Sequence, residues 1–559
     1  MVTAQPSGSS SGRGPGLDVL VVGAGPTGLA LAAQLRRFGA RFRIVDRVTD
    51  RTNESRALAV QARTLELLQS LGLGDTLAAR GTPGSRARIH FDGRLAAEIR
   101  LGGFAAKNTR YPFVLFISQA ETEAVLIDHL TAEGIVIERG VELVELEDGG
   151  DEVRCVLRHG DGREERIAAA YLAGCDGAHS TVRKKTGIPY EGDRYPQEFA
   201  LGDVEADGPL EPGVIHAFSR DGGIAMLFPL GHPRGWRVIG MRPPGAAADA
   251  DAPDPPDLTL DELQAIVDRA TGGGVRLRDP AWMTEFRLHH RQAARYRAGR
   301  VFLAGDAAHI HSPVGGQGMN TGVQDAWNLG WKLALVARGA ADARLVDSYQ
   351  AERWPVGRFL LRNTDRAFGF VARLNTSGGL AAWFRRTVVA RVIRWAGSSA
   401  RLRAYAFRFV SQLAIRYRRS PAVAEGGPRL RAGPRAGDRL PDAPVTRDGR
   451  ATFLQAELAG PRLHLLLCGP VAAWDSQRLA DLTARHGNLL AVRHLTRSPT
   501  AGALVDAGGD VLAMLGVKDT AQYLVRPDGY IAYRCAGTDF TGVVEYLAEW
   551  FPPASDRSA

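Results

Sequence analysis

The sequence predicts an α/β fold of two or three domains, and three observations support this prediction. The chain has 559 residues, which is too long for a single hydrophobic core. Residues 17–46 read as a strand, a glycine loop, a helix and a second strand. From about residue 435 strands and helices alternate again, after a middle segment of short strands in which polar and apolar residues alternate.

The segment 17–46 is typical of a Rossmann-like dinucleotide-binding unit. Gly23, Gly25 and Gly28 form G-x-G-x-x-G between the first strand and the helix. The first glycine permits a tight turn, the second lets the backbone approach a pyrophosphate, and the third lets helix and strand pack closely. Asp46 ends the second strand 18 residues past Gly28, near the spacing of about 20 expected of an acid that binds ribose hydroxyls. The motif predicts a dinucleotide and does not distinguish NAD from FAD.

The following residues add two polar positions and a second motif. Arg56 and Arg63 lie where a loop becomes a helix, and their guanidinium groups either meet phosphate or ring oxygens or are solvated. Gln119 is predicted near a strand–helix junction, where a side-chain amide can bond a cofactor. The motif DGAHSTVR at 176–183 is an Asp-Gly turn that follows a predicted strand.

The third motif is GDAAHIHSPVGGQGMN at 305–320. It follows the apolar run RVFLAGD, which predicts a buried strand, and it precedes a predicted helix. Four glycines and one acid, Asp306, lie between them. A strand end, a glycine-rich turn and a helix start together let backbone N–H groups face an electron-rich ligand.

In this order, the three motifs resemble those of single-component FAD-dependent aromatic-ring monooxygenases of the para-hydroxybenzoate hydroxylase and phenol hydroxylase type. The resemblance runs from about 17 to 356, where it ends in YQAERWPV. It implies that FAD is the cofactor, that NADPH or NADH and O2 are co-substrates, and that a C4a-hydroperoxyflavin delivers one oxygen atom. In this family NADPH has no Rossmann domain to itself, and the sequence contains no second nicotinamide-binding glycine loop.

The resemblance also implies roles for individual residues. Asp46 would bind the adenosine ribose, Asp306 the ribityl chain, and Asp176 would serve both FAD and NADPH. The implied cofactor-binding residues are Gly23, Gly25, Gly28, Asp46, Arg56, Gln119, Asp176, Asp306, Gly316, Gly318, Met319 and Asn320.

Two further residues are candidates for a catalytic role, and no metal site is predicted. Pro313 matches a proline near the reactive edge of the flavin. His289 precedes the cofactor loop and is a candidate base for a substrate phenol, with a surface or core histidine as the alternative interpretation.

The middle of the chain is predicted to carry the substrate. Its runs FALGDVEAD, GVIHAFSRDGGIAMLFPLG and GWRVIGMR predict antiparallel strands. A sheet face with Phe218, Met226, Phe228 and Met241 would roof an aromatic pocket, unless these residues are ordinary sheet core.

Four parts of the chain follow from these patterns. We predict a first part of the FAD-binding domain at 17–195, an antiparallel-sheet substrate domain at 196–295, a second FAD-binding part with Arg-rich helices at 296–425, and a thioredoxin-like domain at 435–559. The last part resembles the C-terminal domain of phenol-hydroxylase-type enzymes. Because it lacks C-x-x-C, we expect it to serve dimerisation, as in a homodimer, or a structural purpose rather than redox chemistry.

Residues 357–419 contain fourteen arginines and one acid, Asp365, whereas the whole chain carries a net charge of +9. Three interpretations remain open: helices with solvated arginines, an interface for an acidic partner such as a carrier protein or for an anionic substrate, and a helix pair on a membrane surface. Nucleic acid is not expected, because no recognition module accompanies the charge.

Cellular location is predicted from absences. The four cysteines form no C-x-x-C pair, which indicates a reducing cytoplasm. The polar start MVTAQPSGSSSGRGPG lacks the apolar core of a secretory leader, and no apolar run is long enough to cross a bilayer.

The sequence therefore predicts an FAD-dependent, NAD(P)H-consuming monooxygenase. Its expected substrate is a phenolic or polycyclic polyketide-like aromatic compound of the kind found in antibiotic biosynthesis. Two alternatives remain open: a Baeyer–Villiger or epoxidising enzyme of a polyketide pathway, and a protein that binds FAD without catalysis.

Overall fold

The computed structural model describes most of the chain. The described ranges are 16–50, 57–84, 86–100, 108–230, 235–242, 258–310, 316–374 and 398–552, together with 387–388, 391–392 and 395. Within these ranges, the side chains of 194–197, 286–289 and 365–374 lie outside the description.

The first sheet confirms the predicted α/β fold. Its order is β17-β18-β11-β1-β2-β8, with parallel pairing from β18 to β8, and β10 and β9 extend β11 as an antiparallel arm. The strands are β1 (Leu17–Val22), β2 (Phe42–Asp46), β8 (Ile137–Arg139), β9 (Val141–Asp148), β10 (Val153–His159), β11 (Glu164–Gly174), β17 (Arg297–Ala298) and β18 (Val301–Leu303). The carboxyl ends of β1, β11 and β18 therefore bring three separate loops to one edge.

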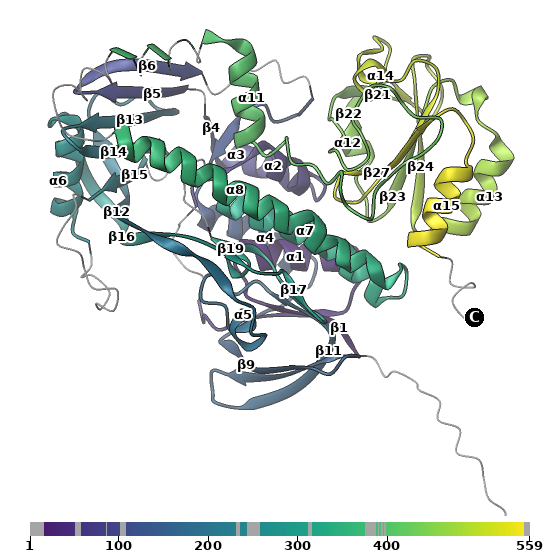
Figure 1. Cartoon of the computed structure of the whole chain (residues 1–559), viewed down its shortest axis with the longest axis horizontal. Coiled ribbons are helices and arrows are strands. Elements are labelled where there is room, and N and C mark those ends of the chain that lie inside the picture. Colours follow the sequence, from purple (N-terminus) through teal and green to yellow (C-terminus); the bar gives the residue numbers. More distant parts are fainter. Residues whose placement is uncertain are drawn as a thin grey trace, which may run out of the picture.

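Two helices with small residues pack closely beside this sheet. Helix α1 (Pro26–Arg37) begins with a proline at its first turn, where no N–H partner is needed. At Gly330 of α7 (Gly318–Ala337), a Cβ would lie 2.6 Å from the Cβ of Gln34, so only glycine allows this approach to α1. The long helix α8 (Asp347–Leu374) runs diagonally across the molecule (Figure 1). The remaining helices of this region are α2 (Ala62–Gln69), α3 (Leu73–Arg80), α4 (Gln119–Ala132), α5 (Thr181–Lys185), η1 (Gly305–Ala307), η2 (Ala343–Val346) and α11 (Ala400–Val410).

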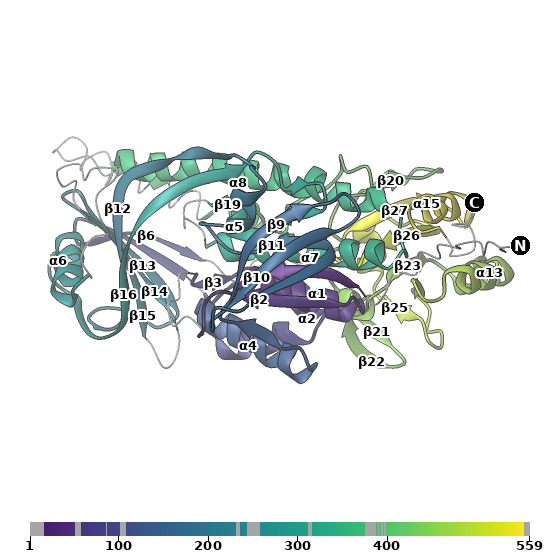
Figure 2. The ribbon, with the colours of Figure 1, turned by 90° about the horizontal axis from the view of Figure 1, so that it is seen from below.

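The second sheet confirms the predicted antiparallel strands. Its order is β19-β16-β12-β15-β14-β13-β5-β6, and only β13 and β5 pair in parallel. The strands are β5 (Arg86–Phe91), β6 (Arg94–Arg100), β12 (Tyr190–Asp207), β13 (Val214–Arg220), β14 (Gly223–Pro229), β15 (Trp236–Met241), β16 (Arg276–Ala293) and β19 (His309–Ile310). The long strands β12 and β16 extend from this sheet towards the nucleotide-binding region (Figure 2).

The two faces of the second sheet pack against different neighbours, which corrects one expectation. Phe218 packs against α6 (Leu260–Thr271), together with Ala225 and Leu227. Phe228 and Met241 lie in a separate apolar cluster on the opposite face. Phe218 of β13 lies opposite Ala225 of β14, so these two share a face, and Phe228, three positions further along β14, lies on the other face. The prediction of one face with all four residues was therefore wrong for Phe218.

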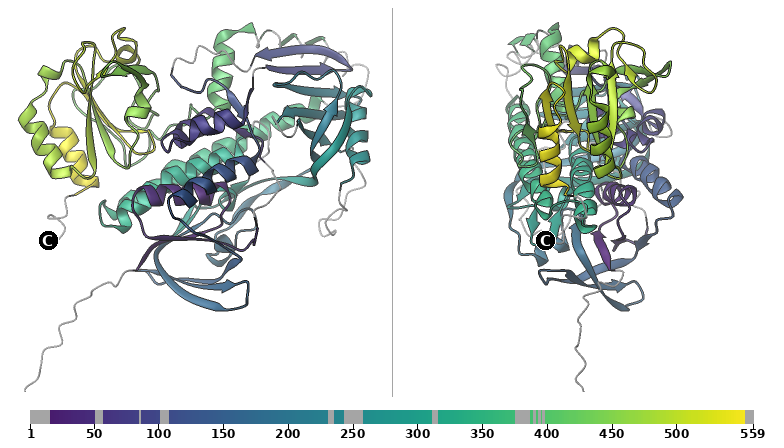
Figure 3. Two further views of the ribbon diagram at one scale, coloured as in Figure 1. Left: turned by 180° about the vertical axis from the view of Figure 1, so that it is seen from behind. Right: turned by 90° about the vertical axis from the view of Figure 1, so that its right-hand side faces the viewer.

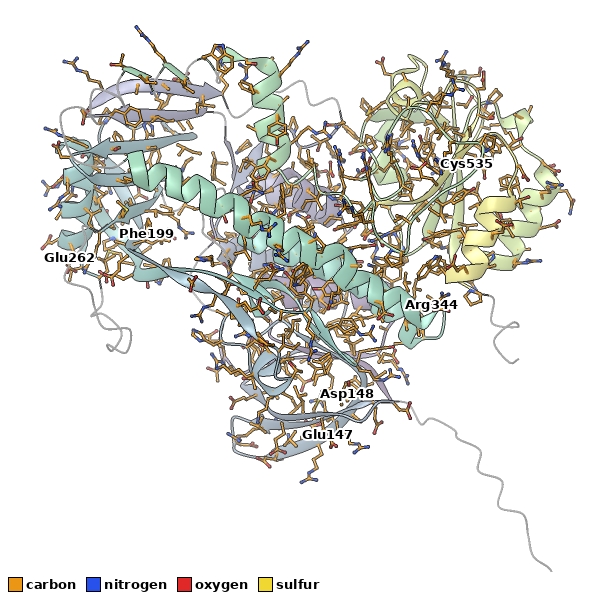
Figure 4. The ribbon with its side chains drawn as sticks, viewed as in Figure 1. Glu147, Asp148, Phe199, Glu262, Arg344 and Cys535 are labelled. Carbon is orange, nitrogen blue, oxygen red and sulfur yellow. The ribbon has the colours of Figure 1, made fainter. Side chains whose placement is uncertain are left out.

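The C-terminal lobe confirms the predicted thioredoxin-like domain and lies beside the rest of the chain (Figure 3). Its sheet has the order β20-β27-β26-β23-β24-β25-β21-β22, with β23, β24 and β25 parallel. Its elements are β20 (Ala424–Glu425), β21 (Pro444–Arg447), β22 (Arg450–Phe453), α12 (Leu454–Glu457), β23 (Leu463–Cys468), η4 (Val471–Ala473), α13 (Ser476–His486), β24 (Leu490–Thr496), β25 (Leu504–Val505), α14 (Asp510–Met514), β26 (Ala521–Val525), β27 (Ile531–Ala536) and α15 (Thr541–Trp550). Cys468 and Cys535 are buried, and burial raises the pKa of both thiols (Figure 4 labels Cys535).

A buried ion cluster joins this lobe to α7 and α8. Arg526 donates to both carboxylate oxygens of Glu352 on α8, at 2.6 and 2.8 Å, and also to Asp528. Lys332 of α7 donates to the same carboxylate at 2.8 Å. Burial opposes ionisation of Glu352, but Arg526 and Lys332 hold its pKa well below the ordinary value. The lobe is thus attached through buried ion pairs in which each charge is compensated by its partners.

Arg63 takes part in the same junction, which corrects a second expectation. Its side chain is buried, donates to Glu66 at 3.0 Å and to the carbonyl oxygen of Asp528, and lies over the ring of Tyr530. The guanidinium group therefore binds the C-terminal lobe rather than phosphate or ring oxygens of a cofactor.

Replacing Arg526 tests the strength of this junction. Arg526→Met leaves the buried carboxylates of Glu352 and Asp528 without their main partner, so we expect the free energy of unfolding to fall by about 3–5 kcal/mol. Urea unfolding measures the change. The matched control is Arg450→Met on an exposed strand, for which we expect a change within about 0.5 kcal/mol. An unchanged Arg526→Met protein would show that the cluster contributes no net stability.

Asp442 predicts a pH dependence of stability. Burial and the nearby Glu66 raise the pKa of its carboxyl group from 3.8 to about 7. The folded state therefore holds a proton that the unfolded state releases, and stability falls as the pH rises from about 4 to about 7. Asp442→Asn keeps the oxygen that accepts from the Gln455 N–H and should flatten this part of the profile. Unfolding at pH 5 and pH 8 measures the difference, with Asp128→Asn on α4 as an exposed control that keeps the wild-type slope.

Candidate functional site

The first glycine loop lies at the carboxyl end of β1. A Cβ at Gly23 would lie 2.4 Å from the carbonyl oxygen of Cys175, and one at Gly28 would lie 1.9 Å from that of Gly23. Both glycines are thus required by close backbone contacts. At Gly25, by contrast, a Cβ would meet no protein atom within 4 Å. Asp46 reaches back to this loop, where its Oδ2 accepts from the N–H of Ala24 at 2.6 Å.

The third motif packs directly on the first. Gly305 begins η1 with a positive φ of 62°, and a Cβ there would lie 2.4 Å from Thr27 Oγ1. A Cβ at Gly322 of α7 would lie 2.3 Å from the same oxygen atom. Thr27 therefore lies between the 305 turn and α7. The side chain of Asp306 is on the exposed side of this turn.

A buried carboxylate holds the 305 turn. Asp325 of α7 accepts from the N–H of Gly305 at 3.1 Å and lies 2.7 Å from Nε2 of His309. Its other oxygen accepts from Nε of Arg353 at 2.6 Å. Burial opposes ionisation, but Arg353 and His309 hold the pKa of Asp325 below its ordinary value. The turn is thus bound to a charged side chain inside the protein.

The DG motif joins the third motif through Arg183. This guanidinium donates to the carbonyl oxygen of Ala307 at 2.9 Å and lies 3.8 Å above the ring of Tyr190. Tyr190 in turn donates to the carbonyl oxygen of Asp306 at 3.0 Å. Asp176 accepts from Ser180 Oγ at 2.5 Å and from the N–H of Val182 at 3.0 Å, so it caps α5, which carries Arg183. Burial raises the pKa of Asp176 despite these bonds.

Asn320 and Gln119 bond the backbone beside the third motif. Asn320 Nδ2 donates to the carbonyl oxygens of Ala59 and Gly316, each at 2.8 Å, and its Oδ1 accepts from the N–H of Gln61 at 2.8 Å. Gln119 Oε1 accepts from the N–H of Ala57 at 3.1 Å.

The remaining predicted cofactor residues lie at the start of α7 or outside the description. Gly318 is the first residue of α7, Met319 packs against the large core, and Gly316 has a positive φ of 61°. Arg56 and Pro313 lie outside the described residues. His289 lies in β16 opposite Arg194, and its side chain is not described.

An apolar cluster, the substrate-sheet cluster, adjoins these motifs on the side of the second sheet, which is the predicted substrate sheet. It combines the second sheet with the small sheet of β3 (Ala59–Val60), β4 (Thr82–Gly84) and β7 (Val114–Phe116). Its members are Leu58, Ala59, Val114, Phe116, Phe199, Leu201, Leu230 and Ile239, with Ile215, Phe228, Met241, Trp282 and Val410 partly buried against them (Figure 4 labels Phe199). Ala59 connects this cluster to the third motif. Its carbonyl oxygen accepts a hydrogen bond from Asn320, and a Cβ added at Gly316 would lie 3.1 Å from the Cβ of Ala59.

This geometry fits a dinucleotide that contains a flavin. The unobstructed backbone at Gly25, at the amino end of α1, suits a pyrophosphate. Asp46, beside the loop, suits a ribose. The 316–320 turn and the start of α7 lie next to an apolar cluster large enough to face an aromatic ring.

Comparisons with known proteins agree with this class of site. A family model described as an FAD binding domain matches residues 16–364, and one described as the C-terminal part of aromatic-ring hydroxylases matches residues 433–554. The chain is 36% identical over 521 residues to 6-methylpretetramide 4-monooxygenase of Streptomyces rimosus, covering 92% of this chain and 90% of that protein.

Solved structures extend the similarity over nearly the whole chain. Anhydrotetracycline hydroxylase from Streptomyces rimosus superposes with a TM-score of 0.74 at 32% identity, covering 96% of this chain and 99% of that one. Aklavinone-11 hydroxylase, solved with FAD and aklavinone, superposes with a TM-score of 0.74 at 26% identity, covering 95% and 98%.

Fold, motifs and matches together define a flavoprotein monooxygenase. The chain belongs to the family of FAD-dependent aromatic-ring monooxygenases, as the resemblance of its three motifs predicted. No helix within the described ranges is long and apolar enough to span a membrane.

Four residues of this site were missed by reasoning from the sequence: Thr27, Arg183, Tyr190 and Asp325. Thr27 and Arg183 lie inside quoted motifs, so their positions were visible but their partners were not. Asp325 lies within a predicted amphipathic helix, where a buried acid that needs an internal partner is the available signal.

Two glycine substitutions separate cofactor contact from protein packing. Gly25→Ala should lower the unfolding free energy of the apoprotein by no more than about 1 kcal/mol, the cost of alanine at a helix N-cap, because the methyl group meets no protein atom and the backbone φ of −76° suits alanine. It should weaken FAD binding at least about tenfold, since the methyl group occupies the space of the pyrophosphate. Gly28→Ala should instead destabilise the apoprotein itself.

Thermal unfolding and FAD titration of the apoprotein measure both effects. If the Gly25→Ala protein bound FAD with the same affinity as the wild type, the pyrophosphate would not lie at Gly25.

Proposed function

We propose that this monooxygenase hydroxylates an aromatic substrate, phenolic or polycyclic and polyketide-like, with NADPH or NADH and O2 as co-substrates. The balanced reaction converts substrate, O2, NAD(P)H and a proton into hydroxylated substrate, water and NAD(P)+. The observation that carries the proposal is the meeting of the three motifs beside one apolar cluster, joined to it at Ala59.

Each part of the chain has a defined task in this reaction. Gly23, Gly25, Gly28 and Asp46 would hold the adenosine diphosphate part, and Asp306 the ribityl chain. When bound and reduced, FAD supplies the oxygen activation, by the C4a-hydroperoxyflavin chemistry expected from the family. The contacts of Arg183, Tyr190 and Asp325 orient the 305 turn, so that Asp306 is held in one position.

The apolar cluster would bind the substrate ring and exclude water from it. Eight of its side chains are buried, and the five partly buried ones, Ile215, Phe228, Met241, Trp282 and Val410, would face the ring and desolvate it. His289, on β16, is the proposed base for a substrate phenol, and Pro313 the proposed residue at the reactive edge of the flavin. The names of the relatives include 6-methylpretetramide 4-monooxygenase and anhydrotetracycline monooxygenase, and also pentachlorophenol 4-monooxygenase, so they support both polycyclic and phenolic substrates as candidates.

Oxygen transfer by Baeyer–Villiger insertion or by epoxidation is the alternative outcome at the same site. Both reactions also add one oxygen atom, so the mass of the product does not separate them from hydroxylation. The position of the added oxygen in the product separates them, because insertion into a ring enlarges that ring, whereas hydroxylation leaves the ring carbon skeleton unchanged.

A substrate screen with the holoenzyme tests the proposed function. Phenols and polycyclic phenols are supplied with NADPH or NADH, and nicotinamide oxidation is followed together with product mass and structure. We expect substrate-stimulated oxidation and a product with one added oxygen on an aromatic carbon. Bound FAD that neither nicotinamide reduces with any substrate would contradict the proposal, and a ring-expanded product would replace hydroxylation by insertion.

A further inference from the structure

A groove of about 770 Å³ lies between α8, α11 and the segment that follows α11. Its walls carry the rings of Phe359, Tyr405, Phe409 and Tyr417. Phe359 and Tyr405 are unusually open for aromatic residues, with exposed fractions of 52% and 74%. Exposed rings around a concave surface mark a binding site more often than a solvated face.

The groove is strongly cationic. Arg401, Arg408 and Arg419 line it and are exposed, and none of them contacts a carboxylate among the described residues. Two further arginines on its wall, Arg416 and Arg418, already contact Asp438.

The acid on the groove wall does not compensate this charge. Glu352 is 2% exposed, and its oxygens accept from Arg526, Lys332, Asn328 and Ser420. Arg401, Arg408 and Arg419, which have no carboxylate partner in the part of the chain that the structure describes, therefore favour an anion in the groove.

The size of the groove decides what kind of anion fits. Two turns of an α-helix with side chains occupy on the order of 1,000 Å³, so a partner helix would lie with part of its surface outside the groove, whereas a fused-ring acid fits within it. A membrane surface cannot enter a concave groove. A benzene ring fits a cavity of about 150 Å³, so about three or four fused rings with an acidic substituent fill the space. Such volumes are typical of small-molecule sites.

We propose that the groove between α8 and α11 is a second ligand site, specific for a planar aromatic acid. The rings of Phe359, Tyr405 and Phe409 would stack on the ligand. Guanidinium groups of Arg401 and Arg408 would bind its carboxylate or phenolate, since their planar fork matches such oxygens. This site is separate from the substrate-sheet cluster and requires none of the oxygen chemistry proposed above.

The inner end of the groove is bonded to the start of α7. Gln412, on the groove wall, donates to Thr321 Oγ1 at 2.9 Å and accepts from Gln324. Its backbone has a φ of 60°, which a non-glycine residue adopts only when its surroundings hold it there. Gln317, which precedes α7, donates to the carbonyl oxygens of Phe409 and Val410, each at 3.4 Å. A ligand in the groove therefore contacts a segment that is joined to the flavin loop.

A fluorescent acid and its neutral analogue test the proposal on the oxidised holoenzyme. The probe is 2-anthracenecarboxylate, and 2-anthracenecarboxamide is the uncharged comparison. We expect saturable binding of the acid, at least about tenfold tighter than binding of the amide, and weaker at high salt because the contacts are ionic. Fluorescence anisotropy measures both dissociation constants.

Substitutions locate the bound probe. The double variant Arg401→Gln/Arg408→Gln should bind the acid at least about tenfold more weakly and leave amide binding unchanged, and Arg419→Gln should show a smaller loss. Arg450→Gln, an exposed arginine of β22, is the matched control and should bind as wild type does. FAD content and circular dichroism confirm that each variant is folded.

Three results would overturn the inference. Equal affinity for acid and amide would show an apolar groove without anion selectivity. Unchanged acid binding in the double variant would place the probe elsewhere, including at the substrate-sheet cluster. A loss of affinity for the acid in Arg450→Gln equal to that in the double variant would mean that binding depends only on the net charge of the protein.

Discussion

The buried carboxylate of Asp325 is the contact on which the rest of the site depends. It is bound at once to the N–H of Gly305, to His309 and to Arg353, so it joins a turn, a short strand and a long helix. Arg353 in turn donates to the Thr321 carbonyl oxygen and to the Tyr417 hydroxyl. Because none of these groups is exposed to water, each needs the others to remain buried at acceptable cost.

Glu352, the residue before Arg353, belongs to a second buried ion cluster. Glu352 precedes Arg353 on α8 and binds Arg526 of the C-terminal lobe, whereas Arg353 binds the flavin-side turn. Two adjacent residues of one helix thus connect the cofactor region with a lobe that has no cofactor motif of its own. This arrangement gives the lobe a structural purpose in the monooxygenase, whether or not it also mediates dimerisation.

Much of the fold and part of the site could be predicted from the sequence. The three motifs, the antiparallel middle strands and the thioredoxin-like lobe are encoded in local patterns of glycine, charge and alternation. The contacts between the motifs are not local: Arg183 and Ala307 are 124 residues apart, and no pattern in either segment specifies the other. Arg63 shows the same limit, since its partner Asp528 lies 465 residues away. Phe218 was misplaced for another reason: alternation identifies the two faces of each strand, but the register that decides which residues of β13 and β14 share a face is not readable from either strand alone.

The paired strands β12 and β16 connect the second sheet to the 305 turn, and their irregular positions determine where this connection can bend. The two strands pair from Tyr190 opposite Ala293 to Asp207 opposite Arg276, with register shifts between Arg194 and Glu198 and between Asp203 and Glu205. At one end β16 pairs with β19, beside the 305 turn, and further along β12 pairs with β15. A register shift of this kind disrupts the ladder locally and bends a strand, so these two positions are where the connection between the second sheet and the 305 turn can flex (Figure 2). Any movement of the second sheet relative to the first is therefore expected at the two irregular positions rather than within the regularly paired stretches.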